Sequence, residues 1–188
     1  MEHKLLEHTC INIIYNDRLS DDYVRLLDEF KVQGIIDWNF WEAITDKKTV
    51  VESINASHKR IVKWAKEKGL KDVCIMEQDC KFTSNDSWKY FLKNKPDIYD
   101  IYSAATYVDD LVDKNILCGF HLYFVHSCFY DTFLNVSDTG HIDTEVDKLK
   151  GNFKVCRPFI ALQRAGFSFN HQQKVDYNIV LKKDDILK

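Results

Sequence analysis

The feature that most constrains the fold is a short apolar run that stops abruptly at an acidic cluster. Residues 73–76 (VCIM) are continuously apolar and lack the alternation of a strand with one face in water. Such a run is typical of a central strand that helices cover on both faces. It is followed directly by Glu77, Gln78 and Asp79. Because ligands of open α/β sheets gather beyond the carboxyl ends of the strands, the run predicts both a layered fold and the place of its site.

Segments with strand and helix patterns alternate around this run. Residues 10–15 predict an opening strand, and a helix is expected from Ser20, as its N-cap, to Gly34. A second helix is expected over residues 53–68, with Gly69 after its end. Later in the chain we expect a short helix at 87–92, strands at 98–102 and 117–125, a helix at 128–134, a helix start within 141–149 and a strand at 153–156. This alternation predicts an α/β fold with a mainly parallel sheet and flanking helices.

Length and composition limit the alternatives. The chain has 188 residues, which suits one domain over 1–188, with residues 170–188 as a polar C-terminal tail of unassigned structure. A hydrophobic content of 45% supports a packed core. The net charge of -3 argues against a general nucleic-acid binder, although a local basic patch stays open. Because no apolar run approaches the ~20 residues of a membrane span and residues 1–8 lack a leader-like stretch, we predict a cytoplasmic protein.

The six cysteines do not follow a disulfide or zinc pattern, and no C-x-x-C pair occurs. Five lie among apolar residues and are expected to be buried, reduced thiols: Cys10, Cys74, Cys118, Cys128 and Cys156. Cys80 differs because it follows the acidic cluster, which leaves a chemical role open, but packing is the favoured interpretation.

The acidic cluster suggests a metal site. Glu77 and Asp79 are one residue apart and can face one site at the end of the predicted strand. Hard oxygen ligands of this kind suit Mn²⁺ or Mg²⁺ and, through the metal, a diphosphate. The competing interpretation is a solvated turn.

Several motifs occur together in a definite order. Ser57 and His58 form a Ser-His pair in the second predicted helix, residues 65–69 form an Ala-x-x-x-Gly helix end, and the apolar strand ends in Glu-Gln-Asp. Further motifs are the opening strand at 10–13, a Gly-x-x-x-Tyr element at 119–123, Ile142 with Asp143, and a Pro-x-x-x-x-Gln element at 158–163. In this order the sequence resembles glycosyltransferase family 25, which includes bacterial lipooligosaccharide galactosyltransferases. Members of the family typically have a Ser-His pair that opens a helix and an acidic motif with aspartate at its middle position. Gln78 departs from the family pattern at this middle position.

The resemblance implies a GT-A fold, the Rossmann-like domain of nucleotide-diphospho-sugar transferases. It implies that Asp79 binds Mn²⁺ or Mg²⁺, that Glu77 lies near the metal or the donor ribose, and that His171 can complete the metal shell. The donor-binding residues would be Asn12, Ser57, His58, Glu77 and Gly119. Structural alternatives stay open for three of these residues: a core histidine at His58, a strand bulge at Gly119 and an exposed tail histidine at His171. The aromatic residues Trp38, Phe40 and Trp41 could stack on a ligand, but core packing is favoured.

The catalytic base is predicted to be Asp143, which follows a polar turn and matches an acidic position of the family. The alternative is that Asp143 is a helix N-cap, with Glu145 or Asp109 as the base. The predicted activity is metal-dependent transfer of a sugar from a nucleotide-sugar donor, with a UDP-sugar expected, to a hydroxyl of a glycan acceptor. Two other functions stay open: transfer to a modified nucleic-acid base, protein or small molecule, and a non-catalytic sugar-binding role.

Overall fold

The apolar run 73–76 forms the middle of strand β3 (Asp72–Glu77) in the computed structural model, which describes residues 9–16, 20–107, 117–168, 171–180 and 185–188. Side chains of successive residues point to opposite faces of the sheet. Cys74 and Met76 join one buried cluster, and Val73 and Ile75 join the other, with exposures of 0–2%. Both faces of β3 are therefore covered, as the continuous apolar run predicts.

The central sheet has six strands in the order β2-β1-β3-β6-β5-β7. Their bounds are Ile11–Tyr15 (β1), Trp38–Glu42 (β2), Ile101–Ser103 (β5), Leu122–His126 (β6) and Phe153–Val155 (β7), with β3 as above. Only β6 runs against its two neighbours, whereas the other pairings are parallel. The prediction of an α/β fold with a mainly parallel sheet is confirmed.

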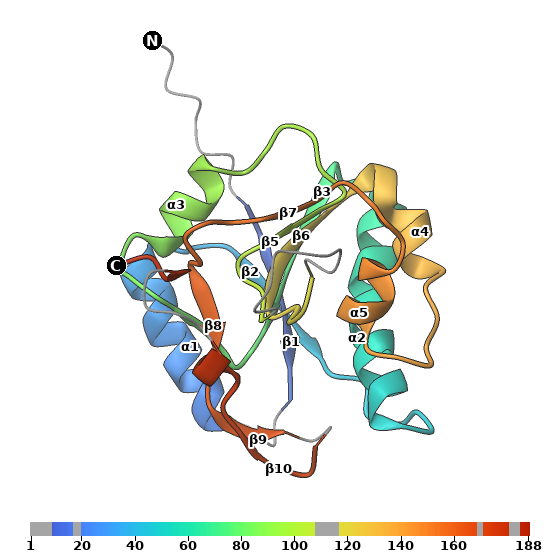
Figure 1. Cartoon of the computed structure of the whole chain (residues 1–188), viewed down its shortest axis with the longest axis horizontal. Coiled ribbons are helices and arrows are strands. Elements are labelled where there is room, and N and C mark those ends of the chain that lie inside the picture. The colour runs from blue at the N-terminus through green and yellow to red at the C-terminus, as the bar shows by residue number, and fades with distance from the viewer. Residues whose placement is uncertain (1–8, 17–19, 108–116, 169–170, 181–184) are drawn as a thin grey trace.

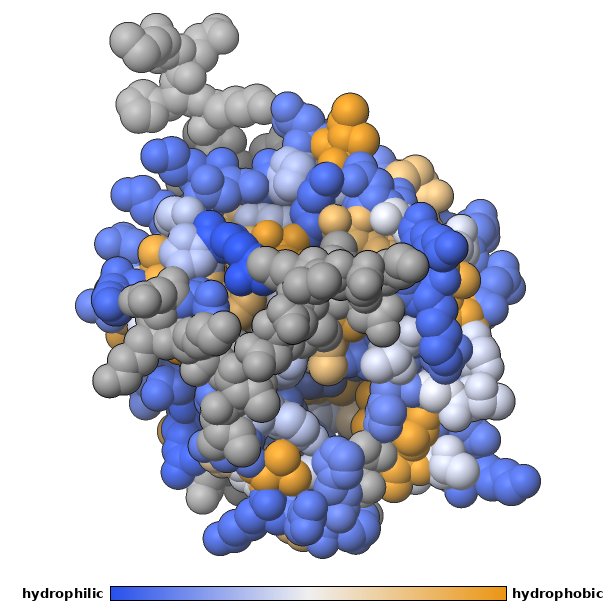
Figure 2. All heavy atoms as spheres, viewed as in Figure 1, coloured by the Kyte–Doolittle hydropathy of each residue, from blue (hydrophilic) through white to orange (hydrophobic). Residues whose placement is uncertain are grey.

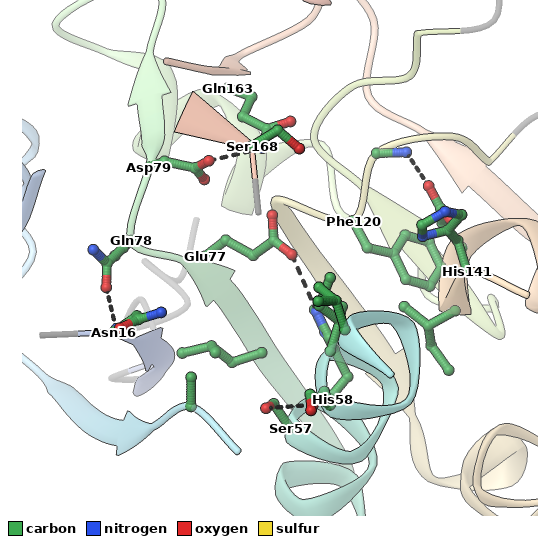
Figure 3. A pocket seen from close by; sticks show the side chains of 18 of the residues that line it. Asn16, Ser57, His58, Glu77, Gln78, Asp79, Phe120, His141, Gln163 and Ser168 are labelled. Atoms are coloured by element: carbon green, nitrogen blue, oxygen red, sulfur yellow. Dashed lines mark hydrogen bonds and ion pairs between the residues drawn. The ribbon is translucent and has the colours of Figure 1, made fainter. Parts of the chain in front are cut away.

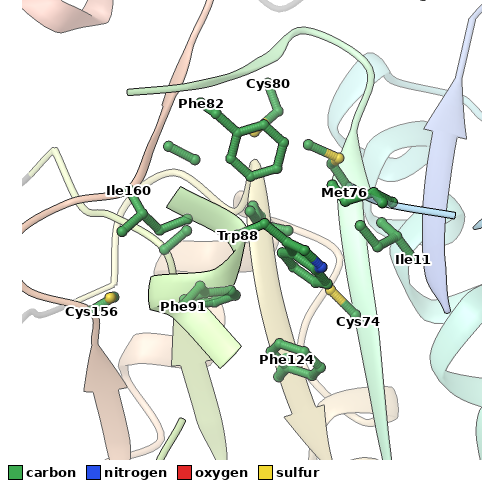
Figure 4. Packing of buried hydrophobic residues seen from close by; sticks show 14 of the residues in the cluster. Ile11, Cys74, Met76, Cys80, Phe82, Trp88, Phe91, Phe124, Cys156 and Ile160 are labelled. Carbon is green, nitrogen blue, oxygen red and sulfur yellow. The ribbon is translucent and has the colours of Figure 1, made fainter. Parts of the chain in front are cut away.

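Helices form a layer on each face of the sheet (Figure 1). One layer contains α1 (Ser20–Gln33) and α3 (Ser87–Lys93), and the other contains α2 (Val50–Glu67), α4 (Tyr130–Leu134), preceded by the short helix η2 (Ser127–Phe129), and α5 (Ile142–Asp147). On the first face, Trp88 of α3 stacks on Phe124 of β6 with ring centroids 6.4 Å apart, and the Phe91 ring lies tilted to Phe124 at 5.5 Å (Figure 4). The two packed faces hold the sheet between the helical layers.

Strand β2 was not predicted from the sequence. It is an edge strand with half-buried tryptophans: the Trp38 ring lies 5.3 Å from the Phe30 ring, and Trp41 lies 5.3 Å from Trp64. Phe40 is 37% exposed and packs against other aromatic rings outside the cavity described below. The favoured interpretation of these aromatics as packing residues holds for Trp38 and Trp41.

Helix α2 begins earlier than residue 53. Thr49 occupies the N-cap position and its Oγ1 accepts a hydrogen bond from the backbone N–H of Glu52 at 3.1 Å. A capping hydroxyl satisfies one of the free N–H groups at a helix start, which the apolar pattern alone does not reveal. Ser57 and His58 consequently lie in the middle of α2 and do not open it.

The predicted strand at 117–125 is shorter in the structure, because β6 begins only at Leu122. Before it, Gly119 has φ +94°, a left-handed conformation that interrupts an extended strand. The strand expected at 98–102 is likewise displaced to β5 (Ile101–Ser103).

The C-terminal segment, which the sequence left unassigned, is structured where it is described. β9 (Gly166–Ser168) pairs antiparallel with β10 (Gln173–Val175), and η3 (Tyr177–Val180) follows. A second small sheet pairs β4 (Cys80–Phe82) with β8 (Ala161–Gln163). This pairing joins the segment after β3 to the C-terminal third of the chain.

The described surface in the view of Figure 2 is mostly hydrophilic, with separate apolar spots. Among the described residues, no helix is both long and apolar enough to cross a bilayer. All six cysteines are free. Burial is confirmed for Cys74 and Cys156, whereas Cys10 and Cys118 are only half-buried and Cys128, in the surface helix η2, is exposed, contrary to the expectation. Cys80 is fully buried, as the favoured packing interpretation predicts.

Candidate functional site

A cavity of about 600 Å³ opens at the carboxyl edge of the sheet. Its walls come from segments far apart in the sequence: the ends of β1 and β3, the first turns of α2 and the loop before it, the segment before β6, the start of α5, and the segment from β8 to η3. This is the edge at which ligands of open α/β sheets gather. The cavity therefore lies where the acidic cluster predicted it.

Asp79 lies in the cavity wall directly after β3. Its Oδ2 accepts a hydrogen bond from Nε2 of Gln163 at 2.7 Å, whereas its buried Oδ1 has no hydrogen-bond partner within the described part of the chain. Burial, and secondarily the negative charge of Glu77, raises the pKa of Asp79 to about 7. An unsatisfied, desolvated carboxylate oxygen beside a second carboxylate is a place for a cation.

Glu77 points into the cavity between Asp79 and His58 (Figure 3). Its Oε1 lies 3.2 Å from Nε2 of His58, which is 1% exposed. The other ring nitrogen of His58 lies 2.7 Å from the hydroxyl of the fully buried Tyr123. His58 thus lines the cavity and also belongs to the packed interior.

Gln78 points away from the two carboxylates. Its side-chain Oε1 accepts a hydrogen bond from the backbone N–H of Asn16, just after β1 (Figure 3). The backbone N–H of Gln78 donates to the carbonyl oxygen of Ile14 at 3.2 Å. Gln78, the residue that departs from the family pattern, is only 4% exposed. Its hydrogen bonds fix the chain after β3 to the end of β1 and the residue after it.

Asp143 and Gly119 meet at the opposite wall. Asp143 is the second residue of α5, so it is not the N-cap, which is His141. Its Oδ2 accepts a hydrogen bond from the N–H of Gly119 at 2.6 Å, and its Oδ1 accepts one from the N–H of Thr144 at 2.8 Å. A Cβ at position 119 would lie 2.7 Å from Cδ2 of Tyr107, so glycine is needed for this approach, and Gly119 is not a simple strand bulge.

Of the alternative bases, Glu145 is not brought to the cavity. Glu145 does not line it and pairs with Nζ of Lys148 at 2.6 Å. Asp109 lies outside the described residues. Asp143 is thus the one of the three candidate bases that the structure places in the cavity wall.

Two predicted donor-binding residues have structural partners. Asn12 does not line the cavity, because its Nδ2 donates to the carbonyl of Cys74 at 3.2 Å and its Oδ1 accepts from Nε1 of Trp41 at 2.9 Å. Ser57 lines the cavity, and its Oγ accepts from the N–H of Ile44 at 2.9 Å, which fixes the loop before α2 to the helix.

His171 lines the cavity at its exposed rim, in the turn between β9 and β10. Its backbone N–H donates to Ser168 and its ring lies beside Tyr177. In the described part of the chain, no three His, Cys, Asp or Glu side chains form a group suited to a metal ion. The structure therefore does not join His171 to Glu77 and Asp79.

Glu77 and Asp79 nevertheless fit a cation that takes its other ligands from a substrate. Mg²⁺ is commonly held by one or two carboxylates together with substrate phosphates and water. The buried Oδ1 of Asp79 has no competing donor in the described chain, which suits a metal ligand. The protein would therefore supply two carboxylates, and a diphosphate would supply the rest.

Sequence reasoning missed Tyr107 and the C-terminal wall of the cavity. The Tyr107 hydroxyl accepts from the N–H of Gln163 at 2.6 Å, and Gln163 in turn holds Asp79. Gln163 had a sequence signal in the Pro-x-x-x-x-Gln element, whereas Tyr107 had none. Phe167, Val175 and Tyr177, which also line the cavity, come from a segment with no clear periodic pattern.

Comparison with known proteins finds similar structures but no similar sequences. No protein-family description and no curated protein matches the sequence. A glycosyltransferase involved in the glycosylation of the major capsid of PBCV-1 is similar in structure, with a TM-score of 0.55 and 12% identity over 87% of this chain and 96% of that one. A mutant Drosophila β1,4-galactosyltransferase 7 in complex with manganese, UDP-Gal and xylobiose has a TM-score of 0.53 and 10% identity over 94% and 80% of the two chains. The glycosyltransferase GlyE of Streptococcus pneumoniae has a TM-score of 0.51 and 6% identity over 79% and 45%.

These similarities concern the fold. The chain has the GT-A fold of nucleotide-diphospho-sugar transferases, with a mostly parallel central sheet and flanking helices. At identities this low, activity has to be argued from the cavity and its residues.

Proposed function

We propose that the protein is a metal-dependent glycosyltransferase that moves a hexose from a nucleotide-sugar donor, a UDP-sugar, to a hydroxyl of a glycan. The observation that carries the proposal is the buried, unsatisfied Oδ1 of Asp79 beside Glu77 at the carboxyl edge of β3. A protein gains no stability from two neighbouring carboxylates in a low-dielectric site, so a bound cation explains their arrangement.

Glu77 and Asp79 would hold Mn²⁺ or Mg²⁺ together with the donor diphosphate. When bound, the metal supplies neutralisation of the charge on the leaving nucleoside diphosphate. Gln163 keeps Asp79 oriented through its hydrogen bond to Oδ2, which leaves Oδ1 available. The galactosyltransferase 7 complex with manganese and UDP-Gal supports this choice of metal and donor.

Asp143 would act on the acceptor side. A carboxylate within hydrogen-bond reach of the acceptor hydroxyl can take its proton while the oxygen attacks the anomeric carbon. The N–H groups of Gly119 and Thr144 hold both Asp143 oxygens and so fix the carboxylate at the cavity wall. A base held in this way loses little conformational entropy on reaction.

Membership of glycosyltransferase family 25 is part of the proposal. It is supported by the order of the sequence motifs and by the positions of Glu77, Asp79, Gly119 and Asp143 around one cavity. The departure at Gln78 is compatible with it, because the Gln78 side chain stabilises the chain after β1 and leaves the two carboxylates free.

A screen of nucleotide sugars tests the proposal. Purified protein is heated with each nucleotide sugar, with and without Mn²⁺, and a ligand that binds only the native state must raise the melting temperature. Binding compounds are then incubated with glycan acceptors, and release of nucleoside diphosphate is measured. We expect a UDP-sugar to stabilise the protein only with Mn²⁺ and to release UDP when a glycan is added.

Other outcomes separate the alternative functions. Release of UDP only with a nucleic-acid base, protein or small molecule would keep the donor and change the acceptor. Metal-dependent binding without transfer to any acceptor would indicate a non-catalytic sugar-binding protein. The absence of any metal-dependent stabilisation would refute the proposal.

A further inference from the structure

We infer that His58, held by the buried hydroxyl of Tyr123, is a positioning residue that fixes the Glu77 carboxylate for the metal-bound donor. The inference rests on the proposed function for its ligand, but its structural part concerns only this chain. It gives His58 a role that differs from both sequence interpretations, namely direct contact with the donor and simple packing in the core.

The three side chains form a continuous path from the core to the cavity. The Tyr123 hydroxyl lies 2.7 Å from Nδ1 of His58, and Nε2 of His58 lies 3.2 Å from Oε1 of Glu77. Tyr123 is 0% and His58 is 1% exposed, whereas the Glu77 side chain is 28% exposed. The path therefore begins in the interior at Tyr123 and ends in the cavity at Glu77, its most exposed member.

Hydrogen-bond chemistry assigns a direction to this path. An ionised carboxylate only accepts hydrogen bonds, so Nε2 of His58 must carry the proton that faces Glu77. In the neutral ring Nδ1 is then an acceptor, and the Tyr123 hydroxyl donates to it. Burial raises the pKa of Tyr123 well above its ordinary value, so its proton stays in place to donate. The Tyr123 hydroxyl thereby selects the tautomer that points a donor at Glu77.

Packing prevents the imidazole from turning away. The His58 ring stacks on the Tyr123 ring at 5.8 Å, and the Tyr123 ring stacks on Phe120 at 4.1 Å. Rigid groups of this kind orient a ligating carboxylate, and loss of such a partner typically costs 10–100-fold in metal affinity.

Glu77 needs such a partner because Asp79 is a like charge nearby. Glu77 ends β3, Asp79 follows two residues later, and both line the cavity, so the two carboxylates repel each other whenever both are ionised and no cation lies between them. A free glutamate side chain would relieve the repulsion by rotating toward water. The hydrogen bond from His58 opposes this rotation and holds Oε1 in place.

The decisive variants are Tyr123→Phe and the matched control Tyr130→Phe. Each removes one hydroxyl from a buried tyrosine of the same core cluster. The hydroxyl of Tyr130 has no hydrogen-bond partner within the described residues and its side chain does not line the cavity. Any difference between the two variants therefore reports the contact with His58.

Two measurements are made on each variant. Nitrogen NMR of the imidazole rings, with the His58 signals assigned by their loss in His58→Gln, gives the tautomer. Calorimetry with UDP and Mn²⁺ gives the affinity. We expect the Nε2–H tautomer in the wild type, a changed His58 signal and about 10-fold weaker UDP–Mn²⁺ binding in Tyr123→Phe, and no change of either in Tyr130→Phe.

Substitutions at His58 separate positioning from packing. In His58→Gln the side-chain amide can still donate toward Glu77, so this variant should keep most of the wild-type affinity for UDP–Mn²⁺. His58→Leu has no such donor and should bind UDP–Mn²⁺ at least as weakly as Tyr123→Phe. If Tyr123→Phe does not fold, the difference in UDP–Mn²⁺ affinity between His58→Gln and His58→Leu tests the positioning role instead.

Each outcome has a distinct consequence. An Nδ1–H tautomer, or equal affinities of Tyr123→Phe and Tyr130→Phe, would overturn the positioning role. Failure of the wild type to bind UDP with Mn²⁺ would instead overturn the proposed function. In that case the NMR comparison still decides whether Tyr123 directs His58 toward Glu77.

Discussion

Replacing Asp79 by asparagine should stabilise the metal-free protein while abolishing metal-dependent donor binding. In the wild type, burial raises the pKa of the Asp79 carboxyl group from 3.8 to about 7. The charged form of Asp79 is therefore unfavourable in the folded state. Asparagine has nearly the same shape, and its carbonyl oxygen can still accept the hydrogen bond from Gln163. Removing a functional residue often raises stability for this reason.

The magnitude follows from the two pKa values. At about 1.4 kcal/mol for each pH unit, the difference between 3.8 and about 7 corresponds to about 4 kcal/mol of destabilisation above pH 7. The hydrogen bond from Gln163 lowers the pKa of Asp79 and is already included in the value of about 7. We therefore expect a gain on the order of 4 kcal/mol for Asp79→Asn above pH 7.

The gain must depend on pH in one direction. Below about pH 4, Asp79 is protonated in both folded and unfolded wild type, so its pKa shift contributes nothing. Between pH 4 and pH 7 the unfolded chain releases this proton and the folded protein retains it, so wild-type stability falls as pH rises. The advantage of Asp79→Asn should therefore grow from pH 4 to pH 7 and stay constant above it.

Urea unfolding in the presence of a chelator measures the effect at pH 4.5, 6 and 8. Asp143→Asn is the control, because hydrogen bonds from Gly119 and Thr144 satisfy both Asp143 oxygens, and it should show no such gain. If Asp79→Asn were less stable than the wild type at pH 8, or its advantage were independent of pH, the argument that Asp79 is an uncompensated buried charge would be wrong.

Four further outcomes are expected. Asp143→Asn should lower turnover by ~10²–10⁴ with unchanged donor affinity in steady-state kinetics, whereas Glu145→Gln, at a residue outside the cavity, should retain turnover. Gly119→Ala should lower the unfolding free energy by about 1–3 kcal/mol more than Gly69→Ala, since both positions have positive φ but only the former Cβ would meet the Tyr107 ring. Gln78→Asp should not strengthen Mn²⁺ binding in calorimetry, because the side chain at 78 faces the N–H of Asn16 and not the cation. Titration of denatured protein, isolated without reductant from a reducing cytosol, should find all six thiols free, and a disulfide would contradict this.

The central part of the fold could be predicted because its sequence signals are local. The run 73–76 revealed a strand with both faces covered, and the acidic residues after it located the carboxyl edge of the sheet. The predicted strand at 10–15 and the predicted helix at 128–134 were also close to the observed elements.

The remaining elements depend on contacts that the sequence does not show. β2 is an edge strand in which bulky aromatic residues pack on both faces, so no alternation of apolar and polar residues marks it. The hairpin of β9 and β10 is polar and is defined by pairing within the C-terminal segment, where periodicity is weak.

In the candidate site, too, some residues have a local sequence signal, whereas their contacts depend on distant parts of the chain. Asp79 and Asp143 could be identified from their places after a strand and at a helix start. The contacts around them could not be predicted, because Gln163 meets Asp79 through the pairing of β4 with β8, and Tyr107 meets Gly119 through a left-handed turn. Asn12 failed to reach the cavity because its amide satisfies polar groups inside the sheet and at its edge.

The most direct test of the central claim is calorimetry of UDP-sugar binding to wild type and Asp79→Ala, each with and without Mn²⁺. We expect Mn²⁺ to strengthen binding to the wild type and to have no effect on Asp79→Ala, while both proteins remain folded by circular dichroism. Equal affinities of the two proteins in the presence of Mn²⁺ would contradict the assignment of Asp79 as the metal ligand.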